Sequence, residues 1–422
     1  MGFGQGVSGL NASAASLDVI GNNIANSGTW GFKSGSASFA DVYAGSRIGS
    51  GTKMNGVALN FKGGDLRQGT GGLDMAVSGG DGFFRVVSSD GNIAYTRNGQ
   101  FSDDKDGFIV NASGQKLTGF PVGPNGQISG GAPVPFQLSK LPMAPKETTA
   151  MSLKFNFDSG AKQPAVNPFD PDNAESYNFQ NSSDVYDTLG NKHNITTFVV
   201  KNPAGDWSMY ATADGWPLDA NGAKVAEDPA NPGKPDMTLA APVGANITFD
   251  NRGTMLTPAN GKFAFAGLDF GNGAAQMKFV LDATGTTQRA SDFNTTPTIQ
   301  NGYAVGVMNE YTMDKDGTII GVYSNGERQP LGQVVLSSFA NPNGLRPNGD
   351  NCYSETTESG QPVTGAASSG GRGDILAGYL EASNVEMTGE LVNMIVAQRT
   401  YQANAQTVKT QDQVMQTLVS MR

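Results

Sequence analysis

The sequence predicts a mainly β protein with α-helical ends. We expect paired N- and C-terminal helices that pack like a coiled coil, an inner discontinuous β-domain, and an outer β-domain inserted into it. Three observations predict this fold class. Apolar residues follow heptad spacing at both ends of the 422-residue chain, Asn-Gly and Asp-Gly dipeptides recur between the ends, and proline concentrates in one internal segment.

The N-terminal segment predicts a helix with one apolar face. Leu10, Leu17 and Ile24 recur every seven residues, which is the spacing of a coiled-coil seam. Gly28, which follows Asn26 and Ser27, is a suitable place for this helix to end because glycine accepts the left-handed conformation of a helix C-terminus.

The C-terminal segment gives a stronger helix signal. Ser383 and Glu386 have the spacing of a capping box, in which the hydroxyl and the carboxylate each satisfy a free amide. No proline follows Pro362, so we expect one helix from about Asn384 to the end. Five of its apolar residues recur every seven positions and form a stripe: Met387, Met394, Tyr401, Val408 and Met415. Four more apolar residues widen this stripe: Leu391, Ile395, Leu418 and Val419.

The middle of the chain reads as turn-rich β-structure with an insertion. Phe101-Ser-Asp-Asp-Lys-Asp-Gly-Phe-Ile109 resembles Tyr311-Thr-Met-Asp-Lys-Asp-Gly-Thr-Ile319, which suggests two hairpins of one domain. Ten of the 21 prolines lie between Pro164 and Pro258, inside the segment that separates these hairpins. We therefore expect three domains: residues 1–71 plus 371–422 for assembly, 72–146 plus 296–370 for the inner β-domain, and 147–295 for the outer one.

Composition excludes several classes of function. A net charge of −10 leaves no basic stripe to displace counterions from phosphates, so we expect no nucleic-acid partner. No run of eighteen apolar residues occurs, so we expect no membrane insertion. The first cationic side chain is Lys33, whereas a cleaved secretory signal begins with basic residues, so we expect export without a cleaved signal peptide.

Several short motifs match sites of enzymes or metal-binding proteins, but their sequence context does not support such a site. Gly4-Gln-Gly6-Val-Ser-Gly9 spells a dinucleotide fingerprint but has no room for a preceding strand. Asp104-Lys-Asp106 and Asp314-Lys-Asp316 are better explained as hairpin tips than as calcium loops. The only histidine, His193, sits in a turn where we expect it half-exposed, and the only cysteine, Cys352, lies in a loop-like stretch. We expect no catalytic residue, no cofactor and no metal.

Two motifs at opposite ends of the chain resemble a known family. Gly21-Asn-Asn-Ile-Ala-Asn-Ser-Gly-Thr-Trp-Gly-Phe-Lys33 resembles the N-terminal signature of the flagellar rod and hook family. Gly378-Tyr-Leu-Glu-Ala-Ser-Asn-Val385 and Glu390-Leu-Val-Asn-Met-Ile-Val-Ala-Gln-Arg399 resemble its C-terminal signature. The resemblance covers residues 1–145 and 296–422, and residues 147–295 are only loosely similar.

This resemblance implies a structural subunit of the bacterial flagellar hook, a flexible tube that couples rod to filament and transmits torque. The paired helices would line the centre of the tube and the inserted domain its outer surface. Implied partners are the chain itself, the distal rod protein, the hook cap, the hook–filament junction proteins and the type III export apparatus. We expect self-assembly to use both seams and the N-terminal signature: Leu10, Leu17, Ile24, Asn22, Asn23, Asn26, Gly31, Phe32, Met387, Leu391, Met394, Tyr401, Val408 and Met415.

Two other hypotheses remain open on the sequence. The distal rod protein of the same family has similar ends, but its shorter chain lacks an inserted outer domain. A β-rich surface adhesin or phage-tail-like protein would explain the Asn- and Gly-rich middle and the tripeptide Arg372-Gly-Asp374, but it does not require both ends for assembly.

Overall fold

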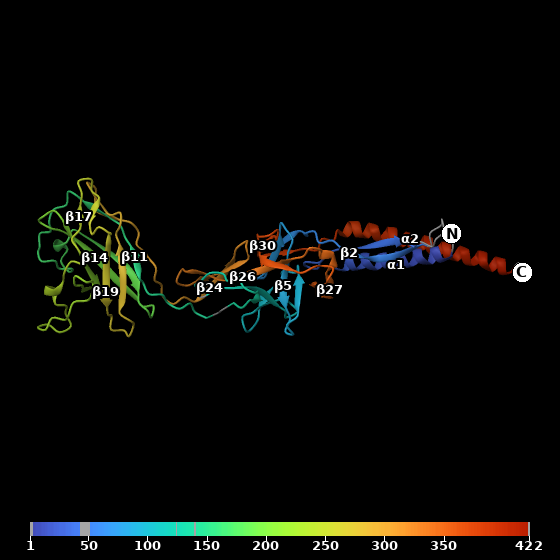
Figure 1. Ribbon diagram of the computed structural model, residues 1–422, viewed down its shortest axis with the longest axis horizontal. Helices are drawn as coiled ribbons and strands as arrows, with labels where there is room; N and C mark the ends of the chain where they lie inside the picture. The colour runs from blue at the N-terminus through green and yellow to red at the C-terminus, as the bar shows by residue number, and fades with distance from the viewer. Residues whose placement is uncertain (1–2, 43–50, 124, 139–140, 421–422) are drawn as a thin grey trace. The chain divides into compact units, whose positions relative to one another are not determined.

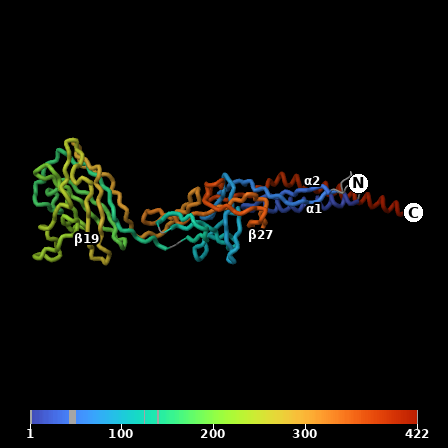
Figure 2. The backbone as a smooth tube through the Cα atoms, viewed as in Figure 1, coloured from blue at the N-terminus to red at the C-terminus, as the bar shows by residue number. Residues whose placement is uncertain are grey.

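The computed structural model describes residues 3–42, 51–123, 125–138 and 141–420 (Figures 1 and 2). The chain forms two compact units. Unit 1 contains Met1–Lys140, Glu310–Val322 and Arg328–Arg422, and unit 2 contains Leu141–Asn309 and Tyr323–Glu327. A mainly β chain with helical ends is confirmed. The helical ends and the inner sheet fall in one unit, so the predicted three-part division remains a proposal.

Two helices and a hairpin form one end of unit 1. Helices α1 (Phe3–Ala25) and α2 (Met387–Ser420) lie side by side, and strands β1 (Gly35–Asp41) and β2 (Thr52–Leu59) pair antiparallel alongside them (Figure 1). No helix within the described ranges is both long and apolar enough to cross a membrane.

The helix boundaries correct two sequence-based expectations. Helix α1 ends at Ala25, before the predicted stop at Gly28, and the left-handed residue in this region is Gly31 (φ +71°). After Ala25, the backbone and side-chain amides of Asn26 both donate to the Asn22 carbonyl, at 3.1 and 3.0 Å. Helix α2 begins at Met387 rather than near Asn384, because the Ser383 hydroxyl accepts the Val385 amide (3.4 Å) in a local turn that is not yet helical.

The core of unit 1 lies on a twelve-stranded sheet with the strand order β24-β25-β26-β9-β5-β6-β28-β27 and four further strands, β7, β8, β10 and β29, off this path. A shared apolar cluster includes Met75, Phe84, Ile109, Leu117 and Leu336. The sheet strands are β5 (Phe83–Val87), β6 (Ile93–Thr96), β7 (Ser102–Asp103), β8 (Ile109–Val110), β9 (Lys116–Pro121), β10 (Val134–Pro135), β24 (Met308–Met313), β25 (Thr318–Tyr323), β26 (Arg328–Ser338), β27 (Arg346–Gly349), β28 (Cys352–Ser354) and β29 (Val363–Ala366).

Two small ribbons connect this sheet to the helices. Strand β3 (Leu66–Gln68) pairs with β31 (Tyr379–Glu381), and β4 (Met75–Ser78) pairs with β30 (Asp374–Ala377). Both ribbons join a segment that follows α1 to a segment that precedes α2. Backbone hydrogen bonds therefore tie the segment after α1 to the segment before α2.

The repeated aromatic–acidic motif forms two hairpins of unit 1, as predicted. In each copy an aspartate amide donates across the turn, from Asp104 to Phe108 and from Asp314 to Thr318, at 2.9 Å. The glycine that closes each turn has a positive φ, +81° at Gly107 and +85° in the second copy, a conformation that glycine adopts without steric cost. The Asp-Gly pairs are therefore hairpin tips.

Unit 2 is built from four small sheets around one core. The core contains Phe157, Trp207, Phe263, Phe265 and Leu281, all at most 1% exposed. Its strands are β11 (Ala150–Ser152), β12 (Phe155–Asp158), β13 (Phe179–Tyr186), β14 (Lys192–Lys201), β15 (Trp207–Ala213), β16 (Trp216–Pro217), β17 (Thr248–Phe249), β18 (Met255–Thr257), β19 (Lys262–Leu268), β20 (Met277–Asp282), β21 (Thr287–Arg289), β22 (Asn294–Thr295) and β23 (Ile299–Gln300).

Candidate assembly surface

Small side chains let the two helices of unit 1 approach closely. A Cβ atom added to Gly6 would lie 2.8 Å from Cγ2 of Val408, and one added to Gly9 would lie 2.8 Å from the Asn404 amide. At the other end of α1, Nδ2 of Asn23 donates to Oε1 of Glu390 at 3.0 Å. These contacts fix an antiparallel register in which later residues of α1 meet earlier residues of α2.

The buried face of α1 is not the predicted apolar seam. Gly6, Ser13, Ile20 and Asn23 are the buried residues of this helix, and the first three have heptad spacing. The predicted seam of Leu10, Leu17 and Ile24 lies four residues further along the chain than this buried set, and its side chains are only half-buried. The heptad period was recognised correctly. Within one chain the α1–α2 contact therefore uses Gly6 and Ser13 together with Ile20 and Asn23, and a role of the predicted seam in self-assembly stays a prediction.

Most of the predicted apolar stripe of α2 faces solvent. Met394 and Val408 are half-buried, and Val408 lies next to Gly6 of α1. The other members are 41–75% exposed: Met387, Leu391, Ile395, Tyr401, Met415, Leu418 and Val419. Ala397 is the buried residue of this helix. One α1 therefore covers only a narrow strip of α2, and in the described part of the chain a broad apolar surface of this helix stays exposed.

The N-terminal signature forms the turn that ends α1 and leads into β1. Both amide atoms of Asn23 bond to the Gly35 backbone, at 2.8 and 2.9 Å. Asn22 and Asn26 bond to each other through their side chains at 2.6 Å. A Cβ added to Gly31 would lie 2.5 Å from the backbone nitrogen of Asn98. These asparagines and this glycine therefore have local structural roles.

Phe32, the remaining residue of this group, is half-buried in the same turn. It lines a pocket together with Asn22, Asn23 and Asn26. The structure thus brings the predicted residues of the N-terminal signature together at the end of α1 and in the turn that follows it.

A buried charge cluster joins the two terminal signatures, and the sequence analysis did not identify it. Lys33 and Arg97 both contact the Glu381 carboxylate, Lys33 at Oε1 and Arg97 at Oε2 (3.4 Å), and all three side chains are at most 4% exposed. Nζ of Lys33 also donates to the Lys62 carbonyl at 2.9 Å. Burial lowers the pKa of Lys33 and of Arg97, and the charge of Glu381 opposes this effect.

Backbone contacts extend this junction. The Gly31 amide donates to the Glu381 carbonyl at 2.7 Å, and the Ser34 amide donates to Oδ1 of Asn384 at 2.8 Å. Removing one member of a buried ion cluster typically costs about 3–5 kcal/mol, because it strands the remaining charges. The junction therefore anchors the base of the helix pair to the β-structure of unit 1.

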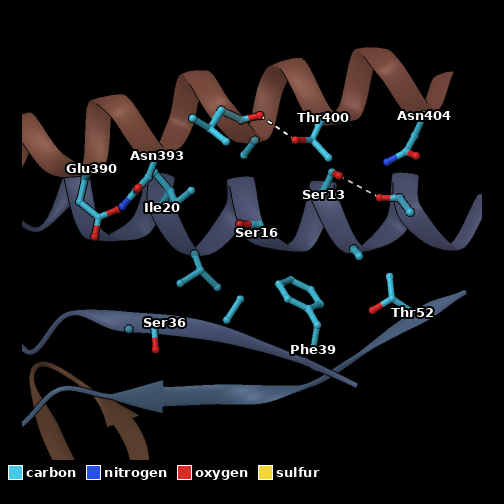
Figure 3. A pocket seen from close by; sticks show the side chains of 17 residues that line it. Ser13, Ser16, Ile20, Ser36, Phe39, Thr52, Glu390, Asn393, Thr400 and Asn404 are labelled. Atoms are coloured by element: carbon cyan, nitrogen blue, oxygen red, sulfur yellow. Dashed lines mark hydrogen bonds between the residues drawn. The ribbon is translucent and has the colours of Figure 1, made fainter. Parts of the chain in front are cut away.

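A groove opens beside the helix pair, between α1, α2 and the β1–β2 hairpin (Figure 3). Its volume is about 560 Å³. Small residues of α1 form part of its lining, and Phe39 points from the hairpin toward α1 in Figure 3. Among the lining residues Glu390 carries the only charge, and Asn23 donates to that carboxylate. The groove is therefore apolar to neutral polar in character.

His193 lies in unit 2 and is buried, not half-exposed as the sequence analysis expected. Its Nδ1 lies 2.7 Å from Oδ2 of Asp214 and its Nε2 lies 3.2 Å from Oδ2 of Asp187. Its ring stacks on Phe270 at a centroid distance of 3.5 Å. Burial of the Asp187 carboxylate favours its neutral form, but hydrogen bonds from Asn191, Asn272 and the histidine outweigh burial and hold its pKa well below the usual range.

Cys352 also departs from expectation, since it lies in strand β28 and is 3% exposed. Its thiol donates to Oε1 of Gln115 at 3.2 Å. Burial, with a smaller contribution from the negative charge of Asp350, raises the pKa of this thiol to about 11. Because the thiolate is the reactive form of cysteine, this side chain acts as a core residue.

The tripeptide that suggested an adhesin is engaged within unit 1. Nε of Arg372 donates to the Ala366 carbonyl at 3.0 Å, and Nη2 donates to Oγ of Ser369 at 2.9 Å. Oδ1 of Asp374 accepts the Ser368 hydroxyl at 2.6 Å. Both charged groups thus have structural partners on one short loop.

The chain matches four flagellar family models that together span most of its length. They describe a flagella basal body rod protein (residues 5–33), the flagellar hook protein FlgE/F/G D1 domain (77–152), the flagellar basal body protein FlaE D2 domain (156–303), and the flagellar basal body rod FlgEFG protein C-terminal region (376–421). The first match covers most of α1 and the last covers all of α2, the two helices of the candidate surface.

Full-length relatives agree with these matches. The flagellar hook protein FlgE of Escherichia coli strain K12 is 43% identical over 425 residues, and that of Salmonella typhimurium strain LT2 is 43% identical over 427, each covering all of both chains. FlgE of Borreliella burgdorferi strain B31 is 33% identical and covers 99% of this chain and 98% of its own.

A solved structure shares the fold. The crystal structure of the Helicobacter pylori flagellar hook protein FlgE2 has 15% sequence identity and a TM-score of 0.51, covering 75% of this chain and 100% of that one. The full-length sequence matches are to hook proteins, which favours the hook over the distal rod and adhesin hypotheses. The chain belongs to the flagellar hook protein family.

Proposed function

We propose that this chain is a non-catalytic building block that polymerises with copies of itself into the tube of the flagellar hook, using the surface of α1, α2 and the β1–β2 hairpin. One observation carries the proposal: α2 is a 34-residue helix with a single buried residue, and its apolar side chains lie mainly in solvent. Such an apolar stripe is costly in a monomer and is typical of an interaction surface.

Polymerisation without closure requires two different complementary surfaces on each subunit. The exposed stripe of α2 and the groove between α1, α2 and the hairpin are two such surfaces within unit 1. The flanking positions of α2 carry many amides and few charges. Amides can exchange hydrogen-bond partners between subunits, whereas a buried unpaired charge is costly.

The remaining parts of the proposal rest on family membership and sequence. Residues 1–71 plus 371–422 would form the central assembly domain, 72–146 plus 296–370 the middle wall, and 147–295 the outer surface of the tube. The chain would be exported by the flagellar type III apparatus without a cleaved signal peptide and lie outside the cell. It would contact the distal rod protein, the hook cap and the hook–filament junction proteins, and transmit torque between rod and filament.

Truncation tests this proposal. We expect a chain lacking residues 1–30 and 385–422 to remain a soluble, β-rich monomer that does not polymerise, because Lys33, Arg97 and Glu381 are retained while both helices are removed. Negative-stain microscopy and sedimentation of the two proteins at equal concentration provide the readout, with tubes of the full chain as the positive control. Tubes formed by the truncated chain would disprove a role of the ends in assembly.

A further inference from the structure

Helix α2 continues past Phe3, where α1 begins, and among the described residues nothing covers its contact face there. Because Gly9 meets Asn404 and Gly6 meets Val408, the beginning of α1 is level with about Gln411. Residues 413–420, which we call the overhang, therefore have no α1 beside them (Figure 2), and all of them are exposed.

The overhang prolongs the interface that already exists within the chain. Leu418 follows Asn404 and Gln411 at seven-residue spacing, so it lies on the helix face that packs against α1. Val414, Met415, Leu418 and Val419 are 48–75% exposed. The overhang contains no charged residue. It is thus a short helical segment with large apolar side chains and a missing partner.

The groove has the opposite properties. It is open and lined on α1 mainly by small side chains, among them Gly9, Ala12 and Ser16, with Val396 of α2 and Phe39 of β1 at its sides. Its one carboxylate, on Glu390, already accepts a hydrogen bond from Asn23. An uncharged helix with large apolar side chains could enter without stranding a charge.

We propose that the overhang of one copy packs into the groove of a second copy. This inference rests on the proposed function and names the contact through which it would work. The pairing cannot form within one chain, because Ser16 is level with about Ala397 and Leu418 lies roughly 30 Å further along α2 at 1.5 Å per residue. Each copy has one overhang and one groove, so every added copy presents a fresh site, which is a heterologous contact that propagates.

Disulfide trapping in assembled tubes tests the contact. Two full-length variants, Ser16→Cys in the groove and Leu418→Cys in the overhang, are mixed, assembled and oxidised. We expect a crosslinked dimer in the mixture and none from either variant alone. Replacing Ser16→Cys by Asn11→Cys, at an exposed α1 position that does not line the groove, provides the matched control. We expect about tenfold less dimer there, because bridged cysteines need Cα atoms within about 7 Å.

If the first pair of substitutions impairs assembly, a second pair tests the same contact: Ala37→Cys on the hairpin side of the groove and Met415→Cys in the overhang. Dimer from either groove pair, with little from the control, supports the proposal. Tubes that form normally but give no groove crosslink, or that crosslink equally well through Asn11→Cys, would overturn it while leaving self-assembly through the ends intact. Failure of the unmodified full chain to form tubes would instead count against the proposed function.

Discussion

Lys33, Arg97 and Glu381 place three charges inside unit 1, where burial alone would disfavour each of them. Their hydrogen bonds to one another and to the Lys62 carbonyl offset part of that cost. Lys33 and Glu381 are 348 positions apart. Sequence patterns describe neighbours within a few residues, so the signatures that contain these residues could be recognised, whereas the contact between them could not be predicted.

Asp187 gives unit 2 a pH-dependent stability. Its folded-state pKa lies below that of an unfolded aspartate, which is about 3.9. Its contribution to the free energy of unfolding is therefore complete above that value and is lost as the pH falls through it toward the folded pKa. We expect Asp187→Asn to lower the stability of unit 2 by roughly 2 kcal/mol at pH 7, since it disrupts charge-assisted hydrogen bonds, and to flatten the acid dependence below about pH 4.

Urea unfolding followed by the fluorescence of Trp207, which lies in the core of unit 2, measures this effect between pH 7 and pH 3. Asp184→Asn is the matched control, because Asp184 is a half-exposed carboxylate whose salt bridge with Lys192 is on the surface and contributes little. If both variants show the same acid dependence as the unmodified chain, the Asp187 network does not govern acid stability.

At the scale of elements, the sequence was most informative where structure is local. The Asp-Gly hairpins could be predicted because the turn geometry depends on a few adjacent residues, such as Gly107. The same local signals predicted a loop at Cys352. Asp350 and Asn351 do form a turn with positive φ, but strand β28 begins directly after that turn and contains Cys352. That strand pairs with the neighbouring β27 and also with β6, far away in sequence, and no local signal predicts the second pairing.

The helices show a different limit. Heptad spacing predicted both of them, but it could not decide which face is covered, because Gly6 and Ser13 contribute to the contact through their small size. A test follows from this close approach. Gly6→Leu should separate the helices and impair tube formation, since a Cβ there already meets Val408 at 2.8 Å. Gly4→Leu is the matched control, because nothing lies within 4 Å of a Cβ at Gly4.

The amount of tube relative to soluble chain, measured by sedimentation, reports this difference. Both substitutions place leucine for glycine two residues apart in one helix, and both gain roughly the same helix propensity of about 1 kcal/mol. Equal assembly of the two variants would mean that the α1–α2 contact is not retained in the tube.

At the scale of the whole molecule, the sequence indicated helical ends, an interrupted inner sheet and an inserted β-segment. The nested plan could be inferred because one motif, repeated 210 residues apart, lies on both sides of a proline-rich segment. The candidate surface was predicted less completely. The apolar stripe of α2 was identified residue by residue, but the groove depends on the three-dimensional meeting of α1, α2 and β1, and no spacing within one segment encodes it.

The last prediction concerns the free subunit. We expect α1 and α2 to be largely disordered in the monomer and to become helical on assembly. Isolated helices are marginal in water, and most of their stability comes from packing. Here α2 has one buried residue in 34 and α1 has four in 23, so a single chain supplies little packing. Glycines at positions 4, 6, 9 and 21 weaken α1 further. The cost of ordering would be offset by contacts between copies.

Hydrogen exchange measures this coupling. Amides 5–26 and 386–420 should exchange at close to random-coil rates in the monomer and become protected in the tube. Amides of β5 and β26, which pair within the core of unit 1, should be protected in both states and serve as the internal control. Strong protection of the terminal amides in a verified monomer would contradict the prediction. In that case the small-residue contact between α1 and α2, anchored by the Lys33–Glu381 junction, is sufficient to hold the helix pair before any second copy arrives.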